Sequence, residues 1–436
     1  MKSKVYSSVE QFKEQNAELK TDLPISDDNS VLCQKVKIGN LELSNRLVCQ
    51  AMEGCDGTSD GRPDELTVRR YERLSKGGAG LIWFEATAVC NEGRANPRQL
   101  YINKKNLDDF KKIVENIKRW GMKENGYEPA VIMQATHSGR YSKPEGKPAP
   151  IIAYNNPIFE KDNPIDKSRI ITDEGLDRVH ESLVHAAGLA KEAGFDGVDI
   201  KCCHRYLNSE LLSAFTREGR YGGSFENRTR LLRESVRDSI SLCGDGFTVT
   251  FRMNVYDGFP YPYGFGVKEG EGITPDLSEA DRLIKELAEL GVKLLDITMG
   301  NPYFNPHVNR PYAAGGYEPP EHPLCGVARM LKGTAKLGKA NPDVSLICSG
   351  LSFLGAAAPG VAAAFIEEGG FSLAGFGRMI FAYPDFAKDI VNGRFDPKKI
   401  CIACSKCTEI MRAGGTPGCI VRDGETYMPI YKKYCK

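Results

Sequence analysis

The sequence lacks any apolar run close to the roughly 20 residues that a membrane-spanning helix needs. Its first twenty residues are mostly polar and contain no apolar segment of the kind found in signal peptides. The formal net charge is only +1, so no charge excess is available to attract nucleic acid or an anionic membrane. We therefore expect a cytoplasmic protein that binds neither nucleic acid nor a membrane.

The sequence also lacks a G-x-G-x-x-G motif directly after a predicted strand. The glycine-rich stretch GGAGL at 77–81 precedes a strand instead. A nicotinamide-binding Rossmann domain needs its glycines after the first strand, where they let the backbone approach a pyrophosphate. We therefore expect no resident domain of that type.

Short β-rich apolar runs alternate with longer stretches of helical periodicity, as in repeated βα units. Eight such runs lie at 47–51, 81–86, 130–135, 197–201, 248–253, 294–299, 344–349 and 373–377. Helical patterns include 107–118, 175–193, 227–242, 278–290 and 357–368. This order predicts an α/β fold, a (β/α)8 TIM barrel, with an open doubly wound sheet as the alternative. We expect an N-terminal arm at 1–30, the barrel at 31–395 and a small cysteine-rich segment at 396–436.

Polar side chains fall at or just after the ends of most of these runs. They are Glu53, Glu85, Gln134, His137, Lys201, His204, Tyr206, Arg252, Asn301, Ser349 and Arg378. Barrel enzymes build their sites at the C-terminal ends of the strands, which favours the barrel over the open sheet. Two long loops, 255–273 and 301–321, are rich in proline, glycine and aromatics and would cover this end. Their aromatic side chains suit a ring-shaped substrate or simply anchor the loops.

The last two runs end in glycine-containing turns, SGL at 349–351 and GFGR at 375–378. Glycine lets backbone N–H groups approach an anion, and arginine adds a charge-assisted hydrogen bond. Barrel enzymes often bind a phosphate at this place. The sequence therefore predicts a phosphate site, unless Gly350 and Gly377 are ordinary turn glycines.

Four of the fourteen cysteines form a regular pattern, Cys401-x2-Cys404-x2-Cys407-x11-Cys419. With no secretory signal, we expect reduced thiols, some of which bind metal. Four thiolates suffice for one iron–sulfur cluster or one zinc ion. Three cysteines at successive two-residue gaps favour the cluster, because zinc more often takes two separated C-x2-C pairs. Zinc is the alternative, and Cys435 has no partner in the pattern.

Two segments resemble the Old Yellow Enzyme family of flavoenzymes. The stretch DIKCCHRYL at 199–207, with YGGSFENR further on, is similar to the family's E-I-H-x-x-[HN]-G-Y-L and Y-G-G-S-x-E-N-R. The stretch QATHSGR at 134–140 is similar to its Q-x-x-H-x-G-R. The resemblance implies that Lys201 and His204 bind a substrate carbonyl oxygen while Tyr206 supplies a proton.

The family usually has histidine where this chain has Lys201. A lysine ammonium stabilises charge as a point cation and also suits a carboxylate or a thioester oxygen, which widens the substrate class. The structural alternatives are an ion pair of Lys201 with Asp199 or Glu85, and ordinary packing roles for His204 and Tyr206.

The resemblance also implies an FMN site at the barrel mouth. Gln134 would bond to the pyrimidine edge of the flavin, and Arg252 would lie near N1 and O2, where its charge stabilises the reduced anion. The alternative for Arg252 is a salt bridge to a barrel glutamate. The FMN phosphate would lie against Ser349, Gly350, Gly377 and Arg378.

The first strand departs from the family pattern N-R-[IV]-x-x-[AS]-P-M-[TC], because this chain reads NRLVCQAME at 45–53. Ala51 and Met52 would lie beside the flavin, and Glu53 takes the place of the usual threonine or cysteine near O4. An ionised Glu53 that faces the ring would lower the flavin reduction potential. Alternatively, Glu53 turns outward and Gly54 or Cys55 lines the pocket.

The dienoyl-CoA reductase and trimethylamine dehydrogenase branches of the family carry a similar cysteine motif after the barrel and bind a [4Fe–4S] cluster with it. The resemblance thus implies an FMN- and [4Fe–4S]-containing ene-reductase. Such an enzyme reduces the C=C bond of an α,β-unsaturated carbonyl compound, a steroid enone, enoate or enoyl thioester, by hydride from flavin N5 and a proton from Tyr206.

Three alternatives remain. An amine dehydrogenase of the trimethylamine dehydrogenase type is disfavoured by the cation at Lys201, and an electron-transfer flavoprotein subunit would not need the proton donor Tyr206. The third alternative is a barrel that holds no flavin and whose C-terminal cysteines bind a structural zinc ion. We expect electrons from NAD(P)H docking transiently over FMN or from a donor protein such as a ferredoxin, flavodoxin or flavoprotein, and we expect a homo-oligomer.

Overall fold

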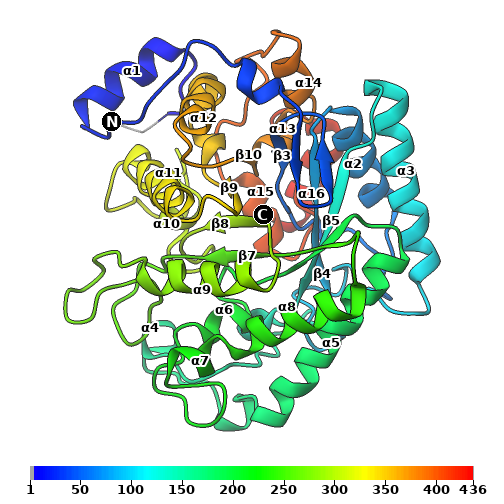
Figure 1. The fold of residues 1–436 in the computed structure, drawn as a ribbon, viewed down its shortest axis with the longest axis vertical. Helices are drawn as coiled ribbons and strands as arrows, with labels where there is room; N and C mark the ends of the chain where they lie inside the picture. The colour runs from blue at the N-terminus through cyan, green and yellow to red at the C-terminus, as the bar shows by residue number, and fades with distance from the viewer. Residues whose placement is uncertain (1–3, 436) are drawn as a thin grey trace.

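The computed structural model describes residues 4–435 and contains a closed barrel of eight parallel strands, in the order β10-β3-β4-β5-β6-β7-β8-β9 (Figure 1). The strands are β3 Leu47–Cys49, β4 Leu81–Ala88, β5 Ala130–Thr136, β6 Gly197–Ile200, β7 Thr248–Asn254, β8 Leu294–Thr298, β9 Ser345–Cys348 and β10 Leu373–Phe376. Each coincides with one of the eight predicted runs. The (β/α)8 barrel predicted from the sequence is confirmed, and the open doubly wound sheet is wrong.

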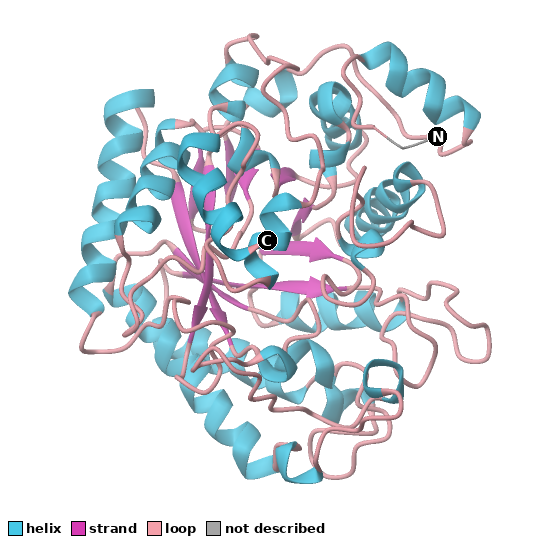
Figure 2. Cartoon of the chain, turned by 180° about the vertical axis from the view of Figure 1, so that it is seen from behind, coloured by secondary structure: helices cyan, strands magenta, loops and turns pink. Residues whose placement is uncertain are grey.

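Helices surround the barrel strands (Figure 2). The longer ones are α2 Glu65–Lys76, α3 Leu107–Asn125, α5 Asp173–Glu192, α8 Arg230–Cys243, α9 Ser278–Glu289, α11 Pro323–Ala340 and α12 Ala358–Glu367. The shorter ones are α4 Pro157–Glu160, α6 Leu207–Leu211, α7 Phe225–Arg228, α10 Pro306–Asn309, α13 Met379–Ala382 and α14 Phe386–Val391. The short helices fall in the loops after the strands, where no periodicity could reveal them.

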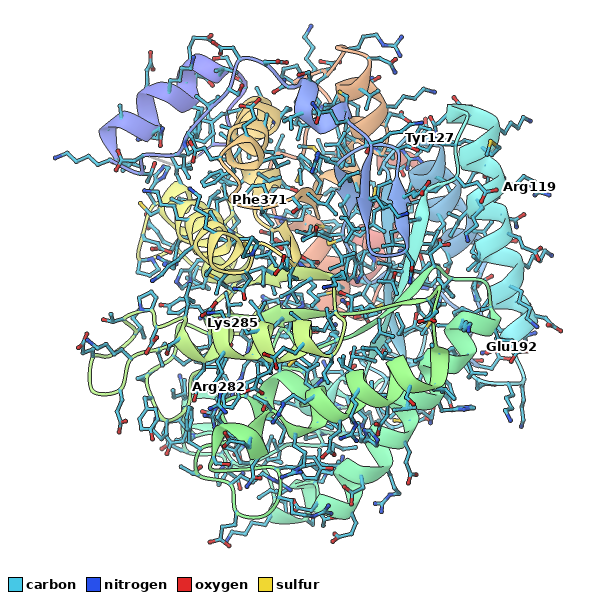
Figure 3. The ribbon with its side chains drawn as sticks, viewed as in Figure 1. Arg119, Tyr127, Glu192, Arg282, Lys285 and Phe371 are labelled. Atoms are coloured by element: carbon cyan, nitrogen blue, oxygen red, sulfur yellow. The ribbon has the colours of Figure 1, made fainter. Side chains whose placement is uncertain are left out.

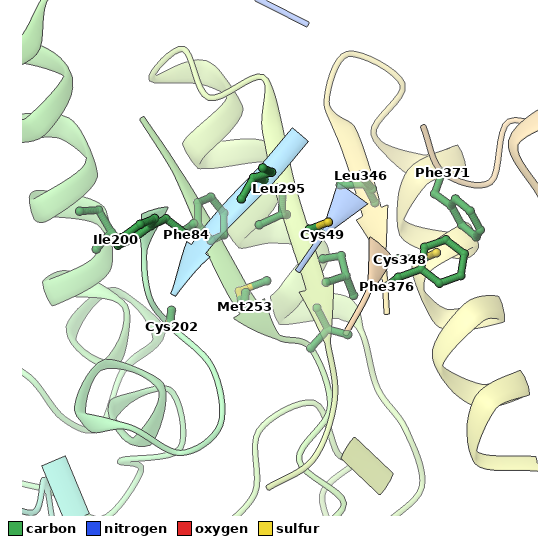
Figure 4. Packing of buried hydrophobic residues seen from close by; sticks show 14 of the residues in the cluster. Cys49, Phe84, Ile200, Cys202, Met253, Leu295, Leu346, Cys348, Phe371 and Phe376 are labelled. Carbon is green, nitrogen blue, oxygen red and sulfur yellow. The ribbon is translucent and has the colours of Figure 1, made fainter. Parts of the chain in front are cut away.

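The helices are amphipathic, and their apolar faces cover the outside of the barrel. Phe84 and Ile200 point outward from their strands and lie in the large core between strands and helices, as does Phe376 (Figure 4). Charged side chains such as Arg119 and Glu192 lie at the outer rim of the molecule (Figure 3). This division follows from the period of 3.6 residues in a helix and of two in a strand.

A hairpin closes the N-terminal end of the barrel. Its strands β1 Val36–Ile38 and β2 Leu41–Leu43 pair antiparallel, and Ile38, Leu41 and Leu43 pack against the first residues of the barrel strands. Burial of these side chains completes the inner core, which also holds Trp83 and Ile132. The polar end of the barrel is therefore the opposite, C-terminal one.

The N-terminal segment contains helix α1, Val9–Glu18, with Ser8 as its N-cap. Phe12 on this helix is fully buried, and the ring of Tyr6 makes edge contacts with Phe12 and Phe353. Residues 1–3 of the predicted arm lie outside the described residues. The segment thus packs against the part of the chain that follows β9.

The cysteine-rich segment folds back over the C-terminal mouth of the barrel. It contains α15 Lys406–Arg412 and α16 Gly424–Tyr434. Asp423 is paired with Arg69 on α2 at 2.8 Å, and Thr416 donates a hydrogen bond to the carbonyl oxygen of Cys55 at 3.1 Å. These contacts place the cysteines next to the ends of β3 and β10.

Within residues 4–435, no helix combines the length and the apolar character needed to cross a membrane.

Candidate functional site

The C-terminal half of the barrel interior is filled by a hydrogen-bonded network of polar side chains. Asp199 on β6 accepts hydrogen bonds from Gln134 Nε2 at 2.6 Å, Trp83 Nε1 at 2.7 Å and the backbone N–H of Arg252 at 2.7 Å. All four residues are buried, and burial raises the pKa of the Asp199 carboxyl. The network therefore fixes the backbone of β6 just before the residues that reach the mouth.

Arg252 on β7 lies beside Asp296 on the next strand, with Nε 2.9 Å from Oδ2. The salt bridge that the sequence left open as the alternative for Arg252 is therefore present, with an aspartate rather than a glutamate as the partner. Gln50 donates to Asp296 Oδ1 at 3.0 Å and to Ser349 Oγ at 2.7 Å. Burial raises the pKa of Asp296 to about 7 even beside this arginine. Arg252 is thus held at the strand end with its charge only partly neutralised.

Lys201 follows β6 and is 5% exposed. Its ammonium lies 3.7 Å from the centre of the Tyr206 ring. Among the described residues, no carboxylate oxygen comes within salt-bridge distance of it, because Asp199 is taken up by the network and Glu85 pairs with Arg70 at 2.6 Å. The two ion pairs considered for Lys201 are therefore absent. Burial lowers the pKa of this lysine, and the nearby Glu53 acts in the opposite direction.

His204 occupies the turn after β6 in a left-handed conformation, φ +64°. Its backbone N–H donates to Asn254 Oδ1 at 3.1 Å, which holds the turn against β7. Burial, together with the cations Arg252, Lys201 and Arg310, lowers the pKa of His204 well below its ordinary value. The imidazole is therefore neutral at pH 7.

Arg205 also has a positive φ, +59°, at the position where the Old Yellow Enzyme pattern has glycine. Its guanidinium is fully buried, 2.8 Å from Asp257 Oδ2 and 3.0 Å from the hydroxyl of Tyr154. A left-handed arginine costs conformational energy that glycine would not, so these contacts have to offset it. They fix the turn that carries His204 and Tyr206.

Tyr206 lies at the start of α6 with its hydroxyl in the pocket. The hydroxyl is 2.9 Å from that of Tyr303 and donates to Glu53 Oε2 at 3.4 Å. Tyr303 in turn stacks on Tyr141 with ring centres 3.8 Å apart, and Asn301 donates to the Tyr141 hydroxyl at 2.7 Å. Burial and the neighbouring Glu53 raise the pKa of Tyr206 well above its ordinary value, so the phenol stays protonated.

The loop after β3 carries Glu53. Arg70 on α2 donates to the carbonyl oxygen of Met52 at 3.1 Å, and the N–H of Gly54 donates to Glu85 Oε2 at 2.7 Å. A Cβ at Gly54 would lie 2.1 Å from the Arg70 guanidinium, which explains the glycine. The Glu53 side chain faces the pocket, and burial raises its pKa.

One pocket collects most of these groups and has about 680 Å³ of empty space. Its walls include the expected Ala51, Met52, Glu53, Gln134, Lys201, His204 and Tyr206. Arg310, Phe381 and Met411 close the other side. Of the aromatics in the two long loops, Tyr303 lines this pocket, whereas Tyr256, Phe259 and Phe265 are buried. These three anchor the first loop, while Tyr261 and Phe304 are exposed.

The predicted phosphate residues lie at the ends of β9 and β10. Gly350 has φ +97°. Arg378 is 6% exposed, and its Nη2 donates to the carbonyl oxygen of Pro311 at 2.6 Å. Its buried Nη1 has no partner in the part of the chain that the structure describes. A buried guanidinium nitrogen without an acceptor is costly, and a phosphate would supply the acceptor. This donor fits the phosphate of FMN. The hydroxyl of Ser349 instead belongs to the barrel network.

The four predicted metal ligands, Cys401, Cys404, Cys407 and Cys419, line a single small pocket beside Arg378. A tetrahedral zinc ion, with Zn–S near 2.3 Å, needs thiolates about 3.8 Å apart. Among the described residues, no three of these thiols lie within 4.8 Å of one another. The wider spacing fits the larger iron–sulfur cluster. Cys407 also lines the pocket of Lys201 and His204, so the two sites share a wall.

The side chains of Cys90, Glu92 and His137 form a second group of potential ligands, with their atoms within 4.8 Å of one another. His137 Nδ1 accepts a hydrogen bond from the N–H of Gly139 at 3.1 Å, so the neutral ring carries its proton on Nε2. Among the described residues, that buried nitrogen has no acceptor. A protonated Nε2 is not a metal ligand, so this orientation of the ring disfavours a metal ion here.

The sequence did not single out Tyr141 and Arg310 as site residues. Tyr141 directly follows the QATHSGR motif, which was the available signal. Arg310 comes from the long loop after β8, and burial and the nearby Arg378 lower its pKa to about 10. No local pattern marks it.

The fold and the motifs have known counterparts. The sequence model of the NADH:flavin oxidoreductase / NADH oxidase family matches residues 32–396. The NADPH dehydrogenase of Halalkalibacterium halodurans is 31% identical over 269 residues, which is 60% of this chain and 71% of that protein. The NADH oxidase of Thermoanaerobacter brockii is 26% identical over 381 residues, 85% of this chain and 52% of that protein.

Two solved structures are similar in fold. A 2-naphthoyl-CoA reductase in complex with 2-naphthoyl-CoA gives a TM-score of 0.73 at 21% identity, covering 93% of this chain and 58% of that one. The histamine dehydrogenase from Rhizobium sp. 4-9 gives 0.67 at 21% identity, covering 90% and 52%. This chain therefore spans little more than half of these longer proteins. The resemblance to the Old Yellow Enzyme family is confirmed: the chain belongs to the NADH:flavin oxidoreductase / NADH oxidase family and is a flavin-dependent oxidoreductase.

Proposed function

We propose that the protein reduces the C=C bond of an α,β-unsaturated carbonyl compound. The observation that carries this proposal is the meeting of Lys201, His204 and Tyr206 in one pocket, with an unpaired cation, a neutral imidazole and a protonated phenol. Reduction of an activated alkene needs positive or donor groups at the carbonyl oxygen and an acid at the α-carbon. The pocket supplies both kinds of group.

Within residues 4–435, no carboxylate lies within salt-bridge distance of the Lys201 ammonium, so a substrate would have no such partner to displace. It is therefore free to stabilise negative charge on a ketone, carboxylate or thioester oxygen, and His204 adds a neutral hydrogen-bond donor. Fixed charges in a buried pocket stabilise a developing oxyanion more strongly than water does. Steroid enones, aromatic acrylates and fatty dienoyl thioesters all present such an oxygen.

Tyr206 is the proposed acid. Its phenol keeps its proton at neutral pH because burial raises its pKa, and its hydroxyl lies in the pocket beside Tyr303. Protonation of the α-carbon leaves a Tyr206 phenolate, which has to be reprotonated before the next turnover. Bound FMN would supply the hydride for the β-carbon, with Gln134 and Arg252 at its ring and Arg378 at its phosphate.

We propose that the four tail cysteines hold a [4Fe–4S] cluster. The thiol spacing and the cavity beside Arg378 support it over zinc. Such a cluster would pass single electrons from an electron-transfer protein to the flavin. NAD(P)H, the alternative donor, would instead transfer a hydride directly to the flavin.

Amine oxidation, as in the histamine dehydrogenase of similar fold, is the second candidate. A cationic amine would have to approach the unpaired ammonium of Lys201 together with Arg310, and like charges repel strongly where water is excluded. The neutral imidazole of His204 does not offset this charge. The pocket therefore favours an electron-rich oxygen over an amine.

The test is reoxidation of the anaerobically reduced protein by a panel of enones, enoates and enoyl thioesters, with histamine and trimethylamine offered to the oxidised protein. We expect flavin absorption over a broad iron–sulfur background, and reoxidation by at least one unsaturated carbonyl compound. Reduction by an amine would support the second candidate. A colourless protein that contains zinc would contradict both.

A further inference from the structure

Glu53, Tyr303 and Met411 line two adjoining cavities. On one side is the pocket of Lys201 and Tyr206. On the other is a wider opening of about 1530 Å³, which we call the vestibule. Its outer wall is formed by Asn96, Pro97, Arg98, Lys143, Gly146, Arg412 and Tyr434. Glu53 and Tyr303 therefore form the polar part of the partition between the buried site and a space that solvent can enter.

Tyr206 has no such access of its own, because it is 4% exposed. Its hydroxyl hydrogen-bonds to the two polar residues of the partition, to Tyr303 at 2.9 Å and to Glu53 Oε2 at 3.4 Å. Glu53 is half-buried. A proton that reaches Tyr206 from the vestibule has to pass through one of these two side chains.

We propose that Glu53 is the proton relay that reprotonates Tyr206 from the vestibule after each reduction. The inference rests on the proposed ene-reductase function. In the step, the O–H bond of the Glu53 carboxyl breaks and the Tyr206 phenolate takes the proton. The resulting carboxylate then takes a proton from water in the vestibule. Each turnover consumes one proton, which ends on the α-carbon of the product.

The direction of transfer follows from the acidities of the two groups. A carboxyl is a far stronger acid than a phenol, so a carboxyl gives its proton to a neighbouring phenolate downhill. Burial raises the pKa of the Glu53 carboxyl, which keeps it protonated to higher pH than an exposed glutamate. Tyr303 is a far weaker acid, because burial raises its pKa further. It relays a proton only by accepting another at the same time.

The loop of Glu53 is held by Arg70, which binds the preceding carbonyl oxygen, and by Glu85, which binds the following N–H. The carboxyl accepts a hydrogen bond from the thiol of Cys55 on Oε1 at 3.6 Å and from the hydroxyl of Tyr206 on Oε2 at 3.4 Å, so one oxygen lies toward a residue of the vestibule and the other toward Tyr206. The charged and titratable groups that face it come from its own loop, from α2, from the end of β6 and from the loop after β8: Cys55, Arg70, Lys201, Tyr206 and Tyr303.

The test separates the first turnover from those that follow. Tyr206 starts protonated, so reduced Glu53→Gln protein mixed with substrate should form about one product per site at the wild-type rate. The steady state should then be slower by roughly 10²-fold, the scale of a lost acid–base group. Glu53→Asp should restore part of the rate. Glu92→Gln, an exposed acid on a neighbouring loop, is the matched control and should behave as wild type.

A second variant distinguishes the loss of a proton relay from misfolding. Glu53→Ala should show the same burst, and acetate should rescue its steady state by taking the vacated place, while wild type is unaffected. Steady turnover of Glu53→Gln at the wild-type rate, without a burst, would overturn the relay. A uniform loss in which the first turnover is also slowed, with no acetate rescue, would assign Glu53 a structural role and also overturn it.

Failure of the proposed function gives a different result. Tyr206→Phe should abolish the burst itself, because the first proton is missing. If Tyr206→Phe forms product as fast as wild type, the proposed acid is wrong and the relay has no recipient. If Tyr206→Phe loses the burst while the steady-state rate of Glu53→Gln is unchanged, only the relay is wrong. Lys201 or Tyr303 then reprotonates Tyr206.

Discussion

Replacement of Lys201 by methionine should raise the stability of the protein and lower its activity. Methionine keeps a similar length and removes the charge. A buried, unpaired cation carries a penalty of several kcal/mol, of which the contact with the Tyr206 ring returns roughly 1–2 kcal/mol. The ammonium is 5% exposed and has no carboxylate within salt-bridge distance among the described residues. We therefore expect a net gain of about 1–3 kcal/mol in the free energy of unfolding.

The gain in the free energy of unfolding corresponds to a rise in the melting temperature. At roughly 2 cal/mol/K per residue, a chain of 436 residues has an unfolding entropy of about 0.9 kcal/mol/K. A gain of about 1–3 kcal/mol then raises Tm by roughly 1–3 °C. Differential scanning calorimetry of flavin-loaded protein measures this shift. Lys35→Met, at an exposed and unpaired lysine, is the control and should leave Tm unchanged.

The shift should depend on pH with a defined sign. Because burial lowers the pKa of Lys201, its penalty is fully present below the folded-state pKa and disappears as pH rises toward the unfolded value of 10.5. The advantage of the variant should therefore shrink at alkaline pH. Loss of the oxyanion partner should lower kcat/KM by about 10²–10³-fold. A variant that loses stability while keeping its flavin, or that keeps full activity, would refute this reasoning.

Three further outcomes are expected. Cys407→Ala should remove most of the bound iron and sulfide, whereas Cys435→Ala, outside the cysteine cavity, should keep both in elemental analysis. Burial lowers the pKa of His137 to about 4, so wild type should lose stability as pH falls from 6.5 to 4, and His137→Asn should flatten that slope in thermal unfolding. Gly54→Ala should cost about 1–3 kcal/mol, because its Cβ would lie 2.1 Å from the guanidinium of Arg70, and should lower the flavin content.

The barrel was predictable because its strands are buried on both faces and read as continuous apolar runs. The eight runs and the polar residues at their ends depend only on local sequence. The hairpin of β1 and β2 was not predicted, because each of its strands has only three residues; the Gly39-Asn40 pair between them was the available turn signal. Its role depends on contacts with the barrel interior that no local pattern encodes.

The site was predictable where a motif supplies several residues together. Lys201, His204 and Tyr206 lie within six positions, and the structure brings them into one pocket. The contact of Tyr206 with Glu53 and Tyr303 was not predicted, since these residues are separated by 153 and 97 positions along the chain. Such contacts follow from barrel closure rather than from local sequence.

The same limit applies to charges in the interior. The sequence left open whether Arg252 is paired, and the structure shows Asp296 on the adjacent strand at 2.9 Å. The spacing of the cysteines suggested a cluster, but only the fold shows that Cys407 borders both cavities. Strand register and the return of the tail over the mouth decide these arrangements.

The measurement that tests the central claim most directly is a single turnover in D2O. Anaerobically reduced protein is mixed with an α,β-unsaturated carbonyl compound that reoxidises it, and the product is analysed by NMR. Proton donation by Tyr206 should give a saturated C–C bond with one deuterium at the α-carbon, formed much more slowly by Tyr206→Phe. Reoxidation without a saturated product, or an unchanged rate in that variant, would contradict it.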